Sequence, residues 1–161
     1  MNPFVVGFLQ NAYSPLYAGT IWPYDLWLDA LERSRSGVRL QRLIDATDNI
    51  IDFYFDNTTP EVAENPDDKL TPDVAHINKV LTKYNPKIVL ALGNQAASAL
   101  IPIWHGNLLW LPHPASRTVT NKLYKAAGRL LKKGFEGRYR IKQLEGRYIK
   151  SKISKAKLVN S

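Results

Sequence analysis

The chain has 161 residues, of which 45% are apolar, so it can bury the core of one domain but is too short for two comfortable ones. It contains no cysteine, which excludes a disulfide framework, a thiolate metal site and a cysteine nucleophile. No apolar run approaches the roughly 20 residues of a membrane span, and no signal-peptide pattern is present. We therefore expect a cytoplasmic protein with no membrane contact, associated with the nucleoid if its source is bacterial.

The net charge of +8 is concentrated towards the C-terminus. Residues 1–128 contain 11 Lys and Arg against 12 Asp and Glu, whereas residues 129–161 contain 11 against 2. Such a basic block favours contact with a polyanion, nucleic-acid phosphate above all, although a tail that only aids solubility is the alternative. We expect a domain over residues 1–134 and a basic, partly helical tail over residues 135–161.

The first predicted strand begins at Phe4. It is a short apolar run with β-branched Val5 and Val6, which is typical of a strand buried on both faces. The chain then turns polar at Gln10, Asn11 and Tyr13. In an open α/β sheet, ligands bind beyond the carboxyl ends of the strands, so a site is expected here.

Two helical segments separate this strand from the next. The first has Pro23 in its first turn and ends in a break at residues 34–37, and the second has an apolar face over residues 38–44. Residues 50–55 form the second predicted strand, and a polar turn containing Asn57 follows it.

The second half of the chain repeats this alternation. The predicted elements are an acidic surface loop at 61–70, a helix capped by Thr71, a strand at 87–92, a small-residue helix at 96–100 with Asn94 as its cap, a strand at 107–111 and a helix ending at Gly134. Helices alternating with four apolar strands predict an α/β fold, a three-layer αβα arrangement around a central four-stranded, mostly parallel sheet.

The strand ends carry the candidate chemistry. The polar groups there are Gln10, Asn11, Tyr13, Asn57, His113, Ser116 and Arg117. They contain no metal-ligand cluster and no paired carboxylates, and no glycine-rich phosphate loop follows any strand, so neither a metal nor a cofactor is expected.

His76 is interpreted as a boundary residue and His105 as a turn residue. His113 lies between Pro112 and Pro114, which hold it rigidly, either for catalysis or simply as a structural turn. Amides with one imidazole suit the edge of a pyrimidine base.

Several motifs resemble those of the uracil-DNA glycosylase superfamily. Residues 10–13, Gln-Asn-Ala-Tyr, resemble the Gln-Asp-Pro-Tyr motif of the classical enzymes, with the Asn that the mismatch-specific and single-strand-selective branches carry. Pro23-Tyr24 lies where those branches have Pro-Phe, and Asn57 lies where the family has its base-reading Asn. Residues 87–100 are similar to the family's central strand and following helix, and residues 113–117 with Asn121-Lys122 resemble the second motif of the single-strand-selective branch.

This resemblance implies a monofunctional DNA glycosylase that acts on uracil or a related modified pyrimidine in DNA. It implies that Asn11 and His113 are catalytic, and that Gln10, Tyr13, Tyr24 and Asn57 bind the base. Asn11 would position water without accepting its proton, which predicts a slow enzyme, while Tyr13 would crowd the pyrimidine C5. DNA contacts are expected from Ser116, Arg117, Lys122, Lys132, Lys133, Arg138 and Arg140.

Two other interpretations stay open. The departures at Asn11 and Ala12 from the classical motif are compatible with a weak or inactive glycosylase-like domain that binds DNA or a nucleotide. The second interpretation is a related enzyme that acts on another modified pyrimidine or on free nucleotides. The expected partner is single- or double-stranded DNA, bound by a monomer.

Overall fold

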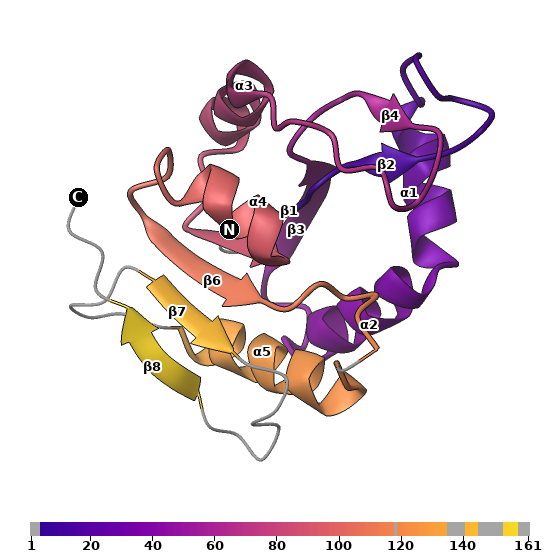
Figure 1. Cartoon of the computed structure of the whole chain (residues 1–161). Coiled ribbons are helices and arrows are strands. Elements are labelled where there is room, and N and C mark those ends of the chain that lie inside the picture. The colour runs from indigo at the N-terminus through magenta and orange to yellow at the C-terminus, as the bar shows by residue number, and fades with distance from the viewer. Residues whose placement is uncertain (1–3, 118, 135–140, 145–152, 158–161) are drawn as a thin grey trace.

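The computed structural model describes residues 4–117, 119–134, 141–144 and 153–157. A six-stranded sheet forms its centre, with the strand order β3-β1-β5-β6-β7-β8 (Figure 1). Neighbouring strands are parallel except for the antiparallel pair β7 and β8. The strands are β1 (Phe4–Leu9), β3 (Asp52–Asn57), β5 (Ile88–Leu92), β6 (Asn107–Leu111), β7 (Ile141–Leu144) and β8 (Ile153–Lys157).

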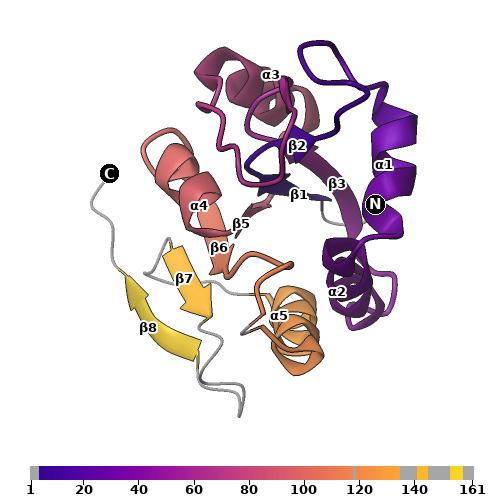
Figure 2. The same cartoon turned by 45° about the vertical axis from the view of Figure 1, so that its right-hand side comes forward.

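Helices cover both faces of this sheet, as Figure 2 shows. On one face lie α1 (Tyr24–Glu32), α2 (Arg35–Asp45) and α5 (Asn121–Lys133), and on the other lie α3 (Val74–Tyr84) and α4 (Asn94–Leu100). β1 and β5 are fully buried between the two layers apart from Phe4, which explains their continuous apolar sequences. The predicted three-layer αβα fold is confirmed.

The helix starts follow local capping chemistry. Ser34 and Thr120 each accept a hydrogen bond from the backbone N–H three residues later, which caps α2 and α5. The cap of α3 is Asp73, which accepts from His76 N, so the prediction of Thr71 was two residues early. α4 likewise begins after Gly93, and Asn94 Oδ1 instead accepts from Trp110 Nε1.

The described parts of the predicted basic tail are strands, and the rest of the tail lies outside the described residues. β7 pairs with β6 and then with β8, which makes the sheet six-stranded instead of four-stranded. The physical reason is that β6 would otherwise present an unpaired edge. Ile141 and Leu144 of β7 are buried, at 0% and 4% exposure, and complete the core on that side.

A second, two-stranded sheet lies beside the carboxyl end of β1. It pairs β2 (Ala12–Tyr13) with β4 (Val62–Ala63), which belongs to the acidic segment predicted as a simple surface loop. Ser14 N also donates to Ala63 O at 2.8 Å. The segment is thereby fixed next to the predicted site. None of the described helices is both long and apolar enough to span a membrane.

Candidate functional site

A cavity of about 640 Å³ opens at the carboxyl ends of β1, β3 and β6. Four residues predicted from the sequence line it together, namely Asn11, Tyr13, Asn57 and His113. They come from positions more than 100 residues apart in the chain, and the parallel sheet brings their strand ends to one edge. Of the four side chains expected to share one cleft, Asn11, Asn57 and His113 line this cavity, whereas Tyr24 does not.

The hydrogen bonds of His113 fix the state of its ring. Ala115 N donates to His113 Nδ1 at 3.0 Å, so Nδ1 is an acceptor and the neutral ring carries its proton on Nε2. Desolvation by the surrounding protein, followed by the positive charge of Lys69, lowers the pKa of His113 below its usual value. At neutral pH this residue is an uncharged imidazole with an N–H donor.

The loop that carries His113 is held from three sides. Arg39 Nη1 donates to the carbonyls of Pro114 and Ser116, the latter at 3.0 Å, and the buried Tyr124 hydroxyl donates to Pro112 O at 2.7 Å. Gly93, with φ of +105°, lies against the ring, because a Cβ there would be 3.4 Å from His113 Cδ2. These contacts give the imidazole one position at the cavity wall.

Asn57 presents an unused amide to the same cavity. Its residue exposure is 7%, and its backbone N donates to Asp56 Oδ1 at 2.7 Å. Among the described residues, no hydrogen bond to its side-chain amide is found. A nearly buried amide that lines a cavity can offer one donor and one acceptor to a ligand.

Asn11 lines the cavity but its amide is already engaged with the 61–70 segment. Its Oδ1 accepts from Leu70 N at 3.0 Å, and its Nδ2 donates to Asp68 O at 3.2 Å and to Ala12 O at 3.1 Å. Gln10 Nε2 donates to Leu70 O at 3.3 Å and is not among the lining residues. Both amides fix this segment, and only Asn11 also faces the cavity.

Tyr24 is not in the cavity. Its hydroxyl donates to Phe55 O at 2.6 Å, and its ring stacks on Tyr54 with the centroids 5.2 Å apart. β3 is an edge strand, so Tyr24 satisfies a carbonyl on the open edge of the sheet. Burial, followed by the charge of Asp56, raises the pKa of Tyr24, which keeps the hydroxyl protonated as a donor.

The aromatic residues that do line the cavity are Trp22, Trp27 and Tyr13. Trp27 is buried, and Trp22 is half-buried and stacks on Tyr17 with the centroids 5.1 Å apart. Sequence reasoning assigned the ring to Tyr24 and missed both tryptophans. The signal was present, because Trp22 directly precedes the Pro23-Tyr24 pair. Arg35, at the start of α2, is a further lining residue that was missed.

The residues predicted to bind DNA are distributed around this region. Arg117 and Lys122 are exposed near the start of α5, whereas Lys132 and Lys133 are exposed at its far end. Ser116 uses its carbonyl to accept from Arg39. Arg138 and Arg140 lie outside the described residues.

The other two histidines lie away from the cavity. His76 Nε2 is 3.5 Å from Asp56 Oδ2, and hydrogen bonding to Asp56 raises its pKa. His105 is exposed in the turn before β6. Within the described part of the chain, no group of three or more His, Asp or Glu side chains is arranged to hold a metal ion.

The model of the uracil DNA glycosylase superfamily matches residues 17–134 of this chain. This range includes Trp22, Asn57 and His113 and starts after Asn11. No curated protein sequence matches the chain. The matched range covers well over half of the sequence, and the chain therefore belongs to the uracil DNA glycosylase superfamily.

Proposed function

We propose that this protein is a DNA glycosylase that hydrolyses the N-glycosidic bond of uracil or a related modified pyrimidine. The observation that carries the proposal is that one cavity is lined by both an Asn57 amide without a hydrogen-bond partner among the described residues and a neutral His113. Superfamily membership supports a glycosylase-like activity. The cavity volume of about 640 Å³ lies within the range of small-ligand sites, which suits one extruded nucleotide.

The base would enter the cavity after leaving the DNA stack, which costs a few kcal/mol and least for a mismatched or unpaired base. Trp22 offers an aromatic surface on which the base can stack, worth about 1 to 3 kcal/mol. The Asn57 amide can then pair with one edge of the pyrimidine. Tyr13, which is 51% exposed, would limit the room at C5 and so disfavour thymine.

His113 would act when the bond breaks. The electron pair of the C1′–N1 bond passes to the pyrimidine ring and places negative charge on O2, while a water oxygen bonds to C1′ and its proton leaves to solvent. A donor that stabilises such developing charge contributes about 10² to 10³ in rate. The Nε2–H of a neutral imidazole is such a donor, and the bond from Ala115 N keeps the proton on that nitrogen.

The test is strand cleavage by alkali after incubation with single-stranded DNA containing one uracil, because only base removal leaves an alkali-labile site. We expect cleavage with the wild type and a rate about 10² to 10³ lower with His113→Ala. His105→Ala is the matched control, since His105 is a histidine outside the cavity, and should retain the wild-type rate. Equal rates for the two variants would refute the assigned role of His113.

The second candidate is a domain that binds DNA or a nucleotide without cutting. The engagement of both Asn11 amide atoms by the 61–70 segment favours it, because the amide is then less available to a water. Tight binding of uracil-containing DNA without any alkali-labile site would establish this alternative. A panel of modified pyrimidines and free nucleotides would separate it from an enzyme with another substrate.

A further inference from the structure

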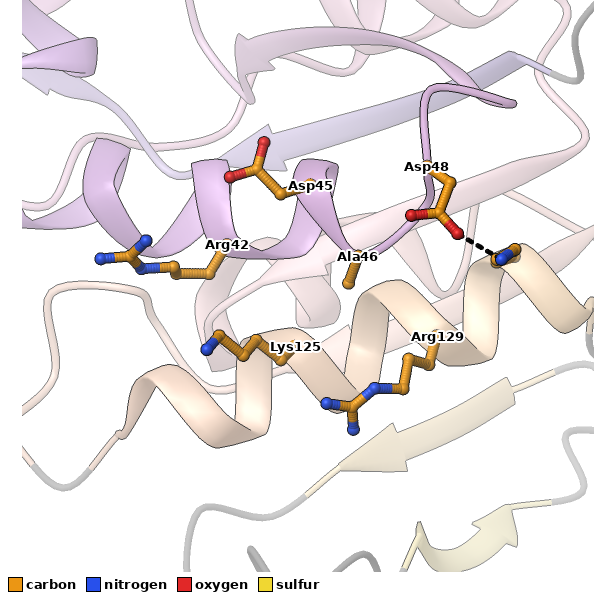
Figure 3. A pocket seen from close by; sticks show the side chains of 7 residues that line it. Arg42, Asp45, Ala46, Asp48, Lys125 and Arg129 are labelled. Atoms are coloured by element: carbon orange, nitrogen blue, oxygen red, sulfur yellow. Dashed lines mark hydrogen bonds and ion pairs between the residues drawn. The ribbon is translucent and has the colours of Figure 1, made fainter.

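A groove of about 550 Å³ lies between α2 and α5, outside the cavity described above (Figure 3). Four basic residues line it, Arg42 from α2 and Lys125, Arg129 and Lys132 from α5. Two carboxylates, Asp45 and Asp48, lie near the end of α2. The groove therefore has an excess of positive charge.

The two carboxylates already have partners. Asp48 forms an ion pair with Lys132, and Asp45 Oδ1 accepts from Gln41 Nε2 at 2.7 Å. No ion pair joins Arg42, Lys125 or Arg129 to a carboxylate of the described residues. In Figure 3 the side chains of Arg42 and Lys125 extend to the same end of the groove. Converging like charges favour an anionic ligand.

The two helices hold these cations in a row. Gly128 brings α5 against α2, because a Cβ at this position would lie 2.2 Å from Leu43 O. Lys125, Arg129 and Lys132 recur at helical spacing on one side of α5, and Lys122 precedes them by one turn. At 1.5 Å per residue, the row from Lys122 to Lys132 spans about 15 Å, which is the rise of about four base pairs along the axis of duplex DNA.

Helix α2 connects the groove to the cavity. Arg35 lines the cavity and Arg42 lines the groove, and a spacing of seven residues places them on one side of α2, roughly two turns apart. The cavity lining also includes Pro66, from the 61–70 segment, which carries four carboxylates and one cation, Lys69. Phosphates are therefore attracted more strongly along α2 than along this segment.

We propose that the α2–α5 groove binds the phosphate backbone of the DNA strand that leads away from the nucleotide in the cavity. The proposal rests on the proposed function for the position of that nucleotide. It assigns DNA contacts to Arg42, Lys125 and Arg129, three exposed residues that are distinct from those that form the cavity. Their contacts are to phosphate, so they contribute affinity without sequence preference.

The test measures binding to a single-stranded oligonucleotide without uracil, by fluorescence anisotropy over a series of salt concentrations. The variant is the triple Arg42→Gln/Lys125→Gln/Arg129→Gln. Each lost phosphate contact lowers the slope of log affinity against log salt by about 0.7, so the slope should fall by about 2. The matched control is Lys79→Gln/Lys83→Gln/Lys87→Gln, which removes three charges beside α3, on the other face of the sheet (Figure 1).

The control triple should retain the wild-type slope within about 0.5. An equal fall in both triples would show that only net charge matters, and an unchanged slope in the groove triple would show that DNA does not contact the groove. Either outcome would overturn the proposal. Uracil excision provides a separate readout of the proposed function, in which the control triple should keep the wild-type rate within twofold. If the wild type excises nothing, the proposed function fails, while the salt slopes still decide whether the groove binds DNA.

Discussion

The protonation state of His113 is set by very few atoms. The backbone N–H of Ala115 occupies Nδ1, and the ring has a lowered pKa because its surroundings desolvate it. His76 shows the opposite behaviour, since hydrogen bonding to Asp56 raises its pKa. Two histidines of one chain thus respond to acid with opposite signs.

This difference predicts how acid affects stability. The folded pKa of His113 lies below the unfolded value of about 6.5, so its contribution is present above about pH 6.5 and is lost as the pH falls towards the folded pKa. His113→Gln should therefore lose less stability than the wild type between pH 7.5 and 5.5, as measured by urea unfolding. The opposite contribution of His76 is present in both proteins and cancels in the comparison. Equal losses in the two proteins would contradict the lowered pKa.

Asn11 has two roles that one substitution separates. Asn11→Asp keeps an acceptor for Leu70 N but turns the donor Nδ2 into an oxygen facing the carbonyls of Asp68 and Ala12. We expect the free energy of unfolding to fall by about 1 kcal/mol. The single-turnover rate of uracil excision should nevertheless rise, because a carboxylate can accept the proton of the attacking water. An unchanged or lower rate would refute the water-positioning role of Asn11.

At the scale of elements, the open edge of β3 explains why the Tyr24 ring lies outside the cavity. Tyr24, Tyr54 and Tyr84 stack in a row, with centroids 5.2 Å and 4.1 Å apart, and Phe4 extends the row. The Tyr24 hydroxyl binds a carbonyl of β3. A motif can place Tyr24 near the cavity in sequence, but the strand order decides that its ring covers a sheet edge instead.

Tyr24→Phe tests this assignment. The variant keeps the ring and loses the hydrogen bond to Phe55 O, so the free energy of unfolding should fall by about 0.5 to 1.5 kcal/mol. Uracil excision at 25 °C should keep the wild-type rate, as Tyr24 does not line the cavity. Trp22→Ala is the comparison, since it removes a lining ring and should slow excision. If Tyr24→Phe excised uracil more slowly while its free energy of unfolding stayed unchanged, Tyr24 would have to be assigned to the site.

The elements that the sequence predicts well are those with a strong local signal. Val5, Val6 and the run of β5 are apolar without interruption, which is typical of a strand between two helical layers. His113 and Asn57 were singled out because each lies in the polar turn after a predicted strand, and both line the cavity. The pairing of β2 with β4 was missed, because two-residue strands have no periodicity and depend on contacts between distant segments.

At the scale of the whole molecule, the basic tail also contributes to the central sheet and to the hydrophobic core. Its charge draws attention to phosphate binding, and the family match also ends at residue 134. Yet Ile141 and Leu144 are buried, and the strand that contains them pairs with β6. Composition could not predict this, because a strand of four residues in a cationic segment is recognised only by the sheet edge that it covers.

A chain that ends at residue 134 should therefore be strongly destabilised. It loses the pairing of Leu108 with Ile141. It also loses the burial of the Ile141 and Leu144 side chains, and burying each of these contributes about 1.5 to 3 kcal/mol to stability. That sum is a large share of the 5 to 15 kcal/mol that stabilises a typical domain, and β6 becomes an exposed edge open to aggregation. Thermal unfolding followed by tryptophan fluorescence, with size-exclusion chromatography, measures both effects. A chain that ends at residue 157 is the control, because it keeps β7 and β8 and should unfold like the full-length protein. Cooperative unfolding of the shorter chain within a few degrees of the control would show that these strands are dispensable, and that the tail acts through its charge alone.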